Sequence, residues 1–286
     1  MVAHLFSNGW YSSRNQRYAT FICTPLFPTL NNHIFIEFME HILGIDVGAS
    51  GIKGALVALE SGKLHGERFR VPTPQPSTPK AMSAAFAEIV EYFNYKGPVG
   101  CGFPSIVKNG VANSAANIDA SWKGTNIEQV FGEATGCRVF ATNDADAAGV
   151  AEMRYGMGEG EQGLVLLITI GTGLGSALFY KGQLVPNTEL GHLLWKHGKS
   201  AEAWCSSGAR ARLKISRMDW AERFNEYLNH LELLFSPDLF ILGGGESKYF
   251  EQYKHILQTE ARITPAKLLN NAGIIGAAGY AAENSR

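Results

Sequence analysis

An aspartate that follows an apolar strand is the residue of this sequence best placed for proton transfer. The strand Arg138–Ala141 leads into Asn143-Asp144-Ala145-Asp146, and α/β folds place reactive groups at strand ends. A carboxylate there can accept the proton of a hydroxyl group that attacks phosphorus, so Asp144 is the candidate general base. Asp146 competes for this role, although it also suits the N-cap of a helix that opens at Ala147.

Polyol recognition needs donors and acceptors together, and two places in the sequence offer both. Asn143 can donate to and accept from neighbouring hydroxyl groups. Glu189 and His192 lie three residues apart around Gly191, so a carboxylate and an imidazole can share one pocket. A structural histidine and a zinc site are the alternatives. No cysteine cluster follows the pair, and Cys205 stands alone, which argues against zinc.

A glycine loop between two apolar strands suits anion binding. In Ile42–Leu59 the first strand ends at Asp46, and the loop Gly48-Ala49-Ser50-Gly51 leads to Lys53 and a second apolar run. Such a loop turns backbone N–H groups toward an anion, and Ser50 and Lys53 can add to a phosphate site. Asp46 can hold magnesium through water. An ordinary β-hairpin with a glycine turn is the alternative.

The same arrangement recurs later in the chain. Val165–Leu184 again reads as strand, glycine loop and strand, 123 residues after the first copy. Its loop contains Gly171, Thr172, Gly173, Leu174 and Gly175. Two such hairpins facing one cleft can hold a polyphosphate tail from both sides, and an internal repeat indicates a duplicated architecture. A third glycine run, Gly243-Gly244-Gly245, follows the buried strand Asp238–Leu242 and is weaker evidence of a phosphate site.

The duplicated hairpins resemble those of the actin, hexokinase and heat-shock-70 ATPase superfamily. The resemblance implies an α/β fold of two ribonuclease-H-like domains with a cleft between them. Apolar spacing and small-residue runs predict helices, and a short apolar run ahead of Pro104 predicts a further strand. The helices are expected near Lys80–Tyr95, Ile127–Thr135, Ala147–Arg154, Trp220–Leu234, Phe250–Thr259 and Gly273–Ala282, and the strand at Val99–Phe103.

Composition narrows the class of protein. The 286 residues carry a formal net charge of −1, which excludes a general basic surface for nucleic acid or an acidic membrane. No apolar run reaches the ~18 uninterrupted residues of a membrane helix. The four cysteines are Cys23, Cys101, Cys137 and Cys205. They are widely scattered, which fits a reducing compartment better than a disulfide framework.

The chain divides into four expected parts. Residues 1–38 form an extension without function, since prolines interrupt their one apolar patch and no helix-turn-helix pattern is present. A secretory signal is the alternative there. Residues 39–142 form the smaller domain and 143–272 the larger domain. Residues 273–286 form a helix that returns to the first domain.

Five motifs together resemble the ROK (repressor, open reading frame, kinase) sugar kinases, from about Met39 to the C-terminus. They are Asp46–Lys53, Asn143-Asp144, Gly171–Gly175, Glu189–His192 and Leu242–Gly245. The resemblance implies that Asp144 is the base and that Asn117, Asn143, Glu189 and His192 hold the sugar. It also implies magnesium as the cofactor.

One departure from most ROK kinases is informative. They carry a cysteine-rich zinc loop after the Glu-x-Gly-His motif, whereas this chain reads Lys199–Cys205. That segment, with Ala115–Thr125 and Ser236–Phe240, is similar to the branch of the family that phosphorylates the 6-hydroxyl of glucose with inorganic polyphosphate, sometimes also with ATP. That branch implies a cytoplasmic homodimer without zinc. An ATP-dependent glucokinase, a sugar-sensing regulator and a chaperone-like ATPase are the rivals.

A polyphosphate donor would need a local track of cations, because the net charge is close to zero. The densest cluster of basic residues consists of Arg210, Arg212, Lys214 and Arg217. We expect this cluster to be the track, with a solvated helix face as the alternative.

Overall fold

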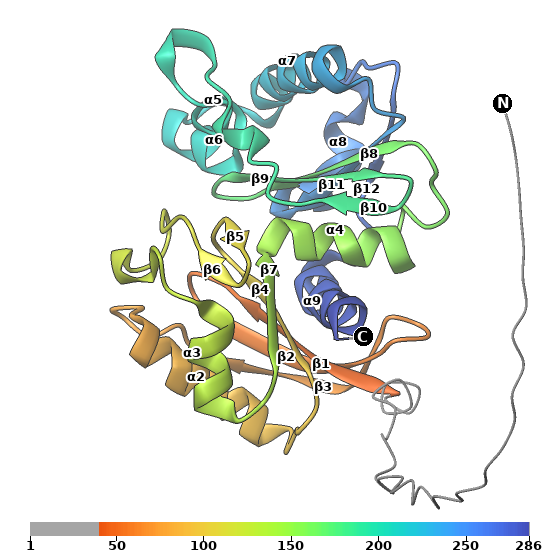
Figure 1. The fold of residues 1–286 in the computed structure, drawn as a ribbon. Helices are drawn as coiled ribbons and strands as arrows, with labels where there is room; N and C mark the ends of the chain where they lie inside the picture. The colour runs from red at the N-terminus through yellow and green to blue at the C-terminus, as the bar shows by residue number, and fades with distance from the viewer. Residues whose placement is uncertain (1–39, 286) are drawn as a thin grey trace, which may run out of the picture.

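Two five-stranded sheets with the same strand arrangement make up the core of the computed structural model, which describes residues 40–285 (Figure 1). The first sheet, in the order β3-β2-β1-β4-β7, contains β1 (His41–Val47), β2 (Ile52–Ala58), β3 (Lys63–Val71), β4 (Val99–Phe103) and β7 (Val139–Asn143). The second, in the order β10-β9-β8-β11-β12, contains β8 (Leu164–Ile170), β9 (Leu174–Tyr180), β10 (Gln183–Val185), β11 (Leu239–Gly244) and β12 (Arg262–Pro265). Since β8 starts 123 residues after β1, the predicted duplication is confirmed.

In each sheet the first hairpin is antiparallel and the later strands are parallel to its first strand. β1 pairs antiparallel with β2 and parallel with β4. β8 pairs antiparallel with β9 and parallel with β11. The ends of β1 and β7 therefore meet at one edge of the first sheet, as do the ends of β8 and β11 in the second. This arrangement gathers the predicted motifs at neighbouring strand ends.

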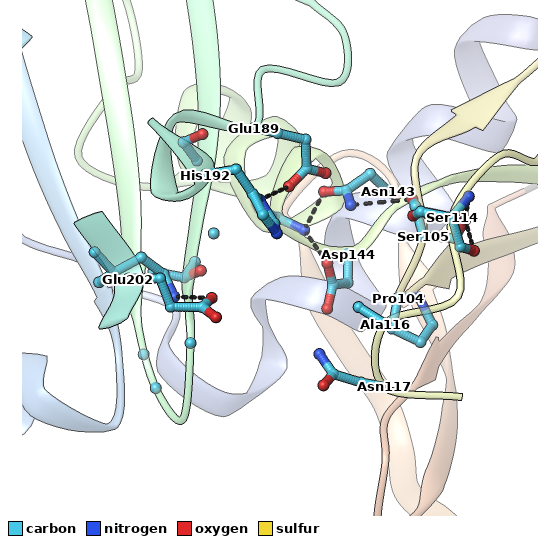
Figure 2. Close-up of a pocket in the computed structure, with 18 residues that line it drawn as sticks. Pro104, Ser105, Ser114, Ala116, Asn117, Asn143, Asp144, Glu189, His192 and Glu202 are labelled. Atoms are coloured by element: carbon cyan, nitrogen blue, oxygen red, sulfur yellow. Dashed lines mark hydrogen bonds and ion pairs between the residues drawn. The ribbon is translucent and has the colours of Figure 1, made fainter. Parts of the chain in front are cut away.

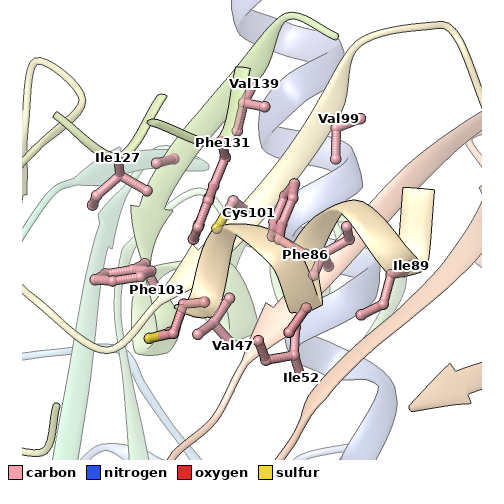
Figure 3. Close-up of a cluster of buried hydrophobic side chains, with 14 of the residues drawn as sticks. Val47, Ile52, Phe86, Ile89, Val99, Cys101, Phe103, Ile127, Phe131 and Val139 are labelled. Carbon is pink, nitrogen blue, oxygen red and sulfur yellow. The ribbon is translucent and has the colours of Figure 1, made fainter. Parts of the chain in front are cut away.

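A pair of helices covers the outer face of the first sheet. These are α2 (Pro79–Tyr92) and α3 (Ile127–Thr135). Their buried positions recur at helical spacing, and Phe86 of α2 stacks on Phe131 of α3 with ring centroids 4.1 Å apart (Figure 3). Thr78 caps α2 by accepting a hydrogen bond from the Ala81 N–H.

The second sheet is covered on its outer face by α7 (Arg217–Phe235), whose Trp220, Phe224 and Leu228 are fully buried. Shorter elements connect the strands and helices of both halves. They are β5 (Val107–Lys108), β6 (Val111–Ala112), α5 (Ala201–Cys205), α6 (Ser207–Leu213), α8 (Phe250–Tyr253), and the 3₁₀ turns η1 (Ala120–Trp122), η2 (Leu190–His192), η3 (Lys196–Gly198), η4 (Gly245–Tyr249), η5 (Lys254–Ile256) and η6 (Leu269–Asn271).

Two helices rich in small residues lie between the sheets, α4 (Asp144–Tyr155) and α9 (Ala272–Asn284). A side chain at Gly44 or Gly100 would collide with the α9 backbone, and one at Gly276 would collide with the α4 backbone. These glycines therefore allow α9 to lie directly on the first sheet and on α4. The last helix thus packs on the first sheet, as its predicted return to the first domain requires.

Two sequence predictions about helices are wrong. The helix expected at Ala147 begins at Asp144, because Asn143 is its N-cap and accepts from the Ala145 and Asp146 N–H groups. Asp146 is therefore not a cap. The helix expected over Phe250–Thr259 ends as an α-helix at Tyr253 and continues only as η5. After η5 the Gln258 N–H donates to the Asn225 side chain of α7, a tertiary contact that the local pattern does not contain.

Some predictions fall outside the described residues, namely the extension 1–38, Met39 and Cys23. The other three cysteines, Cys101, Cys137 and Cys205, are buried with free thiols. Within residues 40–285, the helices are all too short or too polar to cross a membrane. The boundaries of the two domains stay predictions.

Candidate active site

Asp144 lies where two pockets meet in the cleft between the sheets. The first pocket, about 270 Å³, lies between the loop after β4, the β8–β9 loop and η2. The second pocket, about 220 Å³, lies between the end of β1, the end of β11 and the start of α9. Asp144, Ala145, Thr169 and Gly244 line both. A group bound in either pocket would therefore face the same carboxylate.

The carboxyl group of Asp144 titrates near neutrality. Although the side chain is open to solvent through the pockets, the surrounding protein strips part of its hydration, and this is the largest cause that raises its pKa to about 7. The negative charges of Asp46 and then Glu189 raise the pKa further, and the Ala145 N–H lowers it. A base with a pKa near the working pH is well matched to proton transfer.

Asn143 is fixed by the start of α4. Its side-chain oxygen accepts from the Ala145 N–H at 2.8 Å and the Asp146 N–H at 3.2 Å, and its Nδ2 donates to the Ser105 carbonyl at 3.1 Å. The amide therefore has one orientation at the wall of the first pocket. This contact also holds the loop after β4 against the start of α4.

Glu189 and His192 meet in the first pocket as expected. Their Oε2 and Nδ1 atoms are 3.2 Å apart, and η2 places both beside Asn143 and Asp144 (Figure 2). Asn117 reaches the same pocket from the loop before η1. The four residues that the family resemblance assigned to the sugar therefore line one polar cavity with the candidate base.

Five polar residues of this pocket were not expected from the sequence: Ser105, Ser114, Thr169, Ser176 and Glu202. Glu202 is the second residue of α5, and its Oε2 accepts from the Leu174 N–H at 3.0 Å, next to the second glycine loop. No local pattern marks Glu202, since its place depends on the fold of the segment after His192. Ser105 could have been found from the sequence, because it is a polar residue directly after Pro104 at the end of a predicted strand.

Asp146 does not line either pocket. It is 1% exposed, and its Oδ2 accepts from the Asn187 N–H at 2.8 Å. Burial, then the charges of Glu189 and Asp144, raise its pKa to about 7, while the Asn187 N–H opposes the shift. The geometry therefore favours Asp144 over Asp146 as the base.

Asp46 and Lys53 line the second pocket as a cross-strand pair. Their Oδ2 and Nζ atoms are 3.6 Å apart. Burial raises the pKa of Asp46, and Lys53 opposes that shift. Three carboxylates line this pocket, Asp46, Asp144 and Glu152, and the charge of Asp46 raises the pKa of Asp144. The oxygens of Glu152 accept from the Leu268 and Met157 N–H groups, which leaves Asp46 and Asp144 as the pair that can face a bound ion.

This pair of carboxylates fits magnesium, which prefers oxygen ligands and keeps several waters. Within residues 40–285, no three His, Cys, Asp or Glu side chains gather as a metal cluster. Asp46 would therefore hold the ion largely through water, as expected from the sequence. The absence of zinc stays a prediction.

The three glycine loops have different relations to the pockets. Gly171, Gly173 and Gly175 line the first pocket. The backbone of Thr172, in the same loop, packs on Gly208 of α6. Gly243 and Gly244 end β11 beside the second pocket, and Gly244 has a φ of +78°, a conformation that favours glycine. Gly245 opens η4 directly afterwards.

The first loop lies at the rim. Among the described residues, Gly48, Ser50 and Gly51 lie outside the lining of both pockets. The Gly48 N–H donates to the Gly51 carbonyl at 3.1 Å, and Arg70 Nη2 donates to the Ser50 carbonyl at 2.7 Å. The loop is therefore braced, and its role in phosphate binding stays a prediction.

The basic cluster of α6 and α7 is partly neutralised. Glu246, with a side chain 4% exposed, accepts from Arg210 Nη2 at 3.1 Å and Arg217 Nε at 3.2 Å. Arg212 donates to the Ala203 carbonyl at 2.9 Å, and Lys214 ends α6 in a left-handed conformation. The cluster as donor track stays a prediction.

The chain is similar to known proteins over most of its length. The chain is 46% identical over 240 residues to the polyphosphate glucokinase of Mycobacterium tuberculosis, covering 84% of this chain and 90% of that protein. It is 48% identical to the inorganic polyphosphate/ATP-glucomannokinase of Arthrobacter sp. strain KM, whose crystal structure matches with a TM-score of 0.81 over 85% of this chain and 98% of the other.

A second structure, the ROK family glucokinase of Streptomyces griseus in complex with glucose and AMPPNP, matches with a TM-score of 0.68 at 25% identity, over 85% of this chain and 100% of that chain. These likenesses confirm the two-domain α/β fold of hexokinase type. The model of the ROK family itself matches residues 42–213. The family model matches more than half of the chain, and the identity to these relatives is high. Together with the five motifs, this shows that the chain belongs to the ROK family.

Proposed function

We propose that this protein is a polyphosphate–glucose phosphotransferase, with ATP as a second donor. The observation that carries the proposal is the position of Asp144 between a polar pocket suited to a sugar and a second pocket with Asp46, Lys53 and the β11 glycines. The names of the relatives at 46% and 48% identity supply the donor and acceptor classes.

In the proposed reaction, the first pocket holds glucose through Asn117, Asn143, Glu189 and His192, and Glu202 adds a further acceptor. Asp144 accepts the proton of the 6-hydroxyl as its oxygen bonds to the terminal phosphorus. The bond from that phosphorus to the bridging oxygen breaks, and the shortened donor leaves with its electron pair. Magnesium held at Asp46 would neutralise charge on the donor phosphates.

The decisive experiment measures glucose 6-phosphate formation with long-chain polyphosphate and with ATP, side by side under the same conditions. Turnover with polyphosphate supports the proposal. Turnover with ATP alone would make the protein an ATP-dependent glucokinase, and no turnover with either would favour a sugar-sensing regulator. Mannose in a parallel assay tests the acceptor range, because one relative is named a glucomannokinase.

Four further expectations belong to this proposal. Chelation should abolish turnover and added magnesium should restore it, whereas elemental analysis should find no zinc; one zinc per chain would overturn the metal-free interpretation of residues 192–210. The homodimer and the cytoplasmic location implied by the family resemblance are tested by mass measurement in solution and by fractionation.

A further inference from the structure

A row of cations leads out of the second pocket across the edge of the first sheet. In the strand register, Asp46 of β1 is opposite Lys53 of β2, and Lys53 is opposite Arg70 of β3. Directly opposed residues of an antiparallel pair project to the same face of the sheet. Asp46, Lys53 and Arg70 therefore form one line from the second pocket to the edge strand.

Arg68 continues this line along β3. Its Nη1 donates to Asn271 Oδ1 at 3.0 Å. Asn271 lies between Asn270 and Ala272, which both line the second pocket. The guanidinium is therefore at the rim of that pocket, on the side of the sheet that α9 covers. We call Lys53, Arg70 and Arg68 the edge row.

The charges of the edge row are available to an anion. Arg68 and Arg70 are exposed, and their hydrogen-bond partners, the Asn271 amide and the Ser50 carbonyl, are neutral. Within residues 40–285, the ion pairs include neither Arg68 nor Arg70. Among the described residues, the one ion-pair partner of Lys53 is Asp46, the residue expected to hold magnesium.

The basic cluster of α6 and α7, which we call the α6 cluster from here on, has less charge available to an anion. Arg210 and Arg217 share the buried carboxylate of Glu246, so an added polyanion would compete with that internal pair. The edge row also starts in the pocket where phosphoryl transfer is proposed. Its charges and position therefore suit a donor chain better than those of the α6 cluster.

We propose that the edge row binds the phosphates of polyphosphate that lie beyond the reacting one. This inference rests on the proposed function, since it names where that donor lies. Arg70 is two strand spacings from Asp46, roughly 10 Å. A donor with its end at Asp46 reaches Lys53 early and the two arginines only when its chain is long. Long-chain polyphosphate therefore uses the full row, and ATP or tripolyphosphate uses mainly Lys53.

The test compares Arg68→Gln, Arg70→Gln and the double variant with two controls. Lys63→Gln removes one charge from the same strand at its far end, opposite Ala58. Arg212→Gln removes one charge from the rival cluster. Apparent KM is measured for long-chain polyphosphate, tripolyphosphate, ATP and glucose, and the direct binding of labelled long-chain polyphosphate is measured without glucose.

The double variant should raise the KM for long-chain polyphosphate at least ~10-fold and change the KM for ATP and glucose less than ~2-fold. Each lost contact should also lower the slope of log KM against log salt by about one, as on other linear polyanions. Arg68→Gln is the cleaner single variant, because Arg70 also braces the Ser50 loop. The controls should behave as wild type.

Other results would overturn the edge row. Unchanged polyphosphate KM and binding in the double variant would do so, as would equal losses with every donor, or a selective loss in Arg212→Gln alone. The two proposals fail separately. If the wild-type protein binds polyphosphate through these arginines but transfers no phosphate, the proposed function is refuted and the binding role of the edge row is supported. Normal transfer with unchanged variants would refute the row alone.

Discussion

Two carboxylates face Asp144 from opposite pockets, Glu189 from the first and Asp46 from the second. After the loss of hydration, both charges raise the pKa of Asp144 further. The pKa of the proposed base thus depends on one group proposed to bind the sugar and one proposed to hold the metal. Binding at either pocket can therefore alter the basicity of the same carboxylate.

Replacing Asp144 with Asn should separate catalysis from binding. The amide keeps the size of the side chain but cannot accept the proton, so kcat should fall at least ~10²-fold, the usual contribution of a positioned base. The dissociation constant of glucose, measured by calorimetry, should change much less. A variant with nearly normal kcat would remove Asp144 from this role.

The pH dependence of kcat/KM should show an acid limb with its midpoint near pH 7, because Asp144 must be deprotonated to act and its pKa is about 7. Asp46→Asn removes a charge that raises this pKa, so the limb of the residual activity should move to lower pH. Asp146→Asn is the control, since Asp146 also has a pKa of about 7 but faces neither pocket. If the acid limb of kcat/KM changes only in Asp146→Asn, the titrating group is Asp146 and not Asp144.

At the scale of elements, Asn187 ties the β10–η2 segment to β5 and to α4. Its Oδ1 accepts from the Val107 N–H and its Nδ2 donates to the Val107 carbonyl, each at 2.8 Å. Its backbone N–H donates to Asp146. Asn187 thus joins β5 to α4, two residues before Glu189, and holds the first pocket in shape.

Asn187→Gly should weaken glucose binding without touching the base. Glycine accepts the φ of +60° found at this position, so the variant loses the two side-chain hydrogen bonds without added backbone strain. At about 0.5–1.5 kcal/mol each, their loss should raise the glucose KM at least ~5-fold and lower the melting temperature. Asn113→Ala, which removes an exposed contact to Val111, is the control. Equal KM values in both variants would show that the contact does not shape the pocket.

The elements differ in how well their sequences predict them. The two hairpins are visible because apolar runs flank glycine loops at a constant spacing. Glu202 and the Glu246 pair with Arg210 and Arg217 were not foreseen, because each depends on contacts between distant segments. The start of α4 was misplaced because a capping Asn and two acidic residues stand in sequence, and only the hydrogen bonds of Asn143 settle which one is the cap.

At the scale of the whole molecule, α4 and α9 lie between the sheets and contact both the site and the cores. Asp144 begins α4, and Gly273 in the first turn of α9 packs on the Asp46 carboxylate. A shift of either helix would therefore move a reacting group. The sequence shows both helices as runs of small residues, but their packing on each other follows only from the fold.

A chain truncated to begin at Met39 should fold and turn over like the full chain. The first described strand, β1, lies between β2 and β4, so both of its edges are already paired. In the two five-stranded sheets of residues 40–285, the edge strands are β3, β7, β10 and β12, and the first 38 residues are not needed to complete β1. The melting temperature and kcat of the two chains provide the comparison. A large drop in melting temperature on truncation would show that the extension packs on the core, and a drop in kcat alone would place it near the cleft.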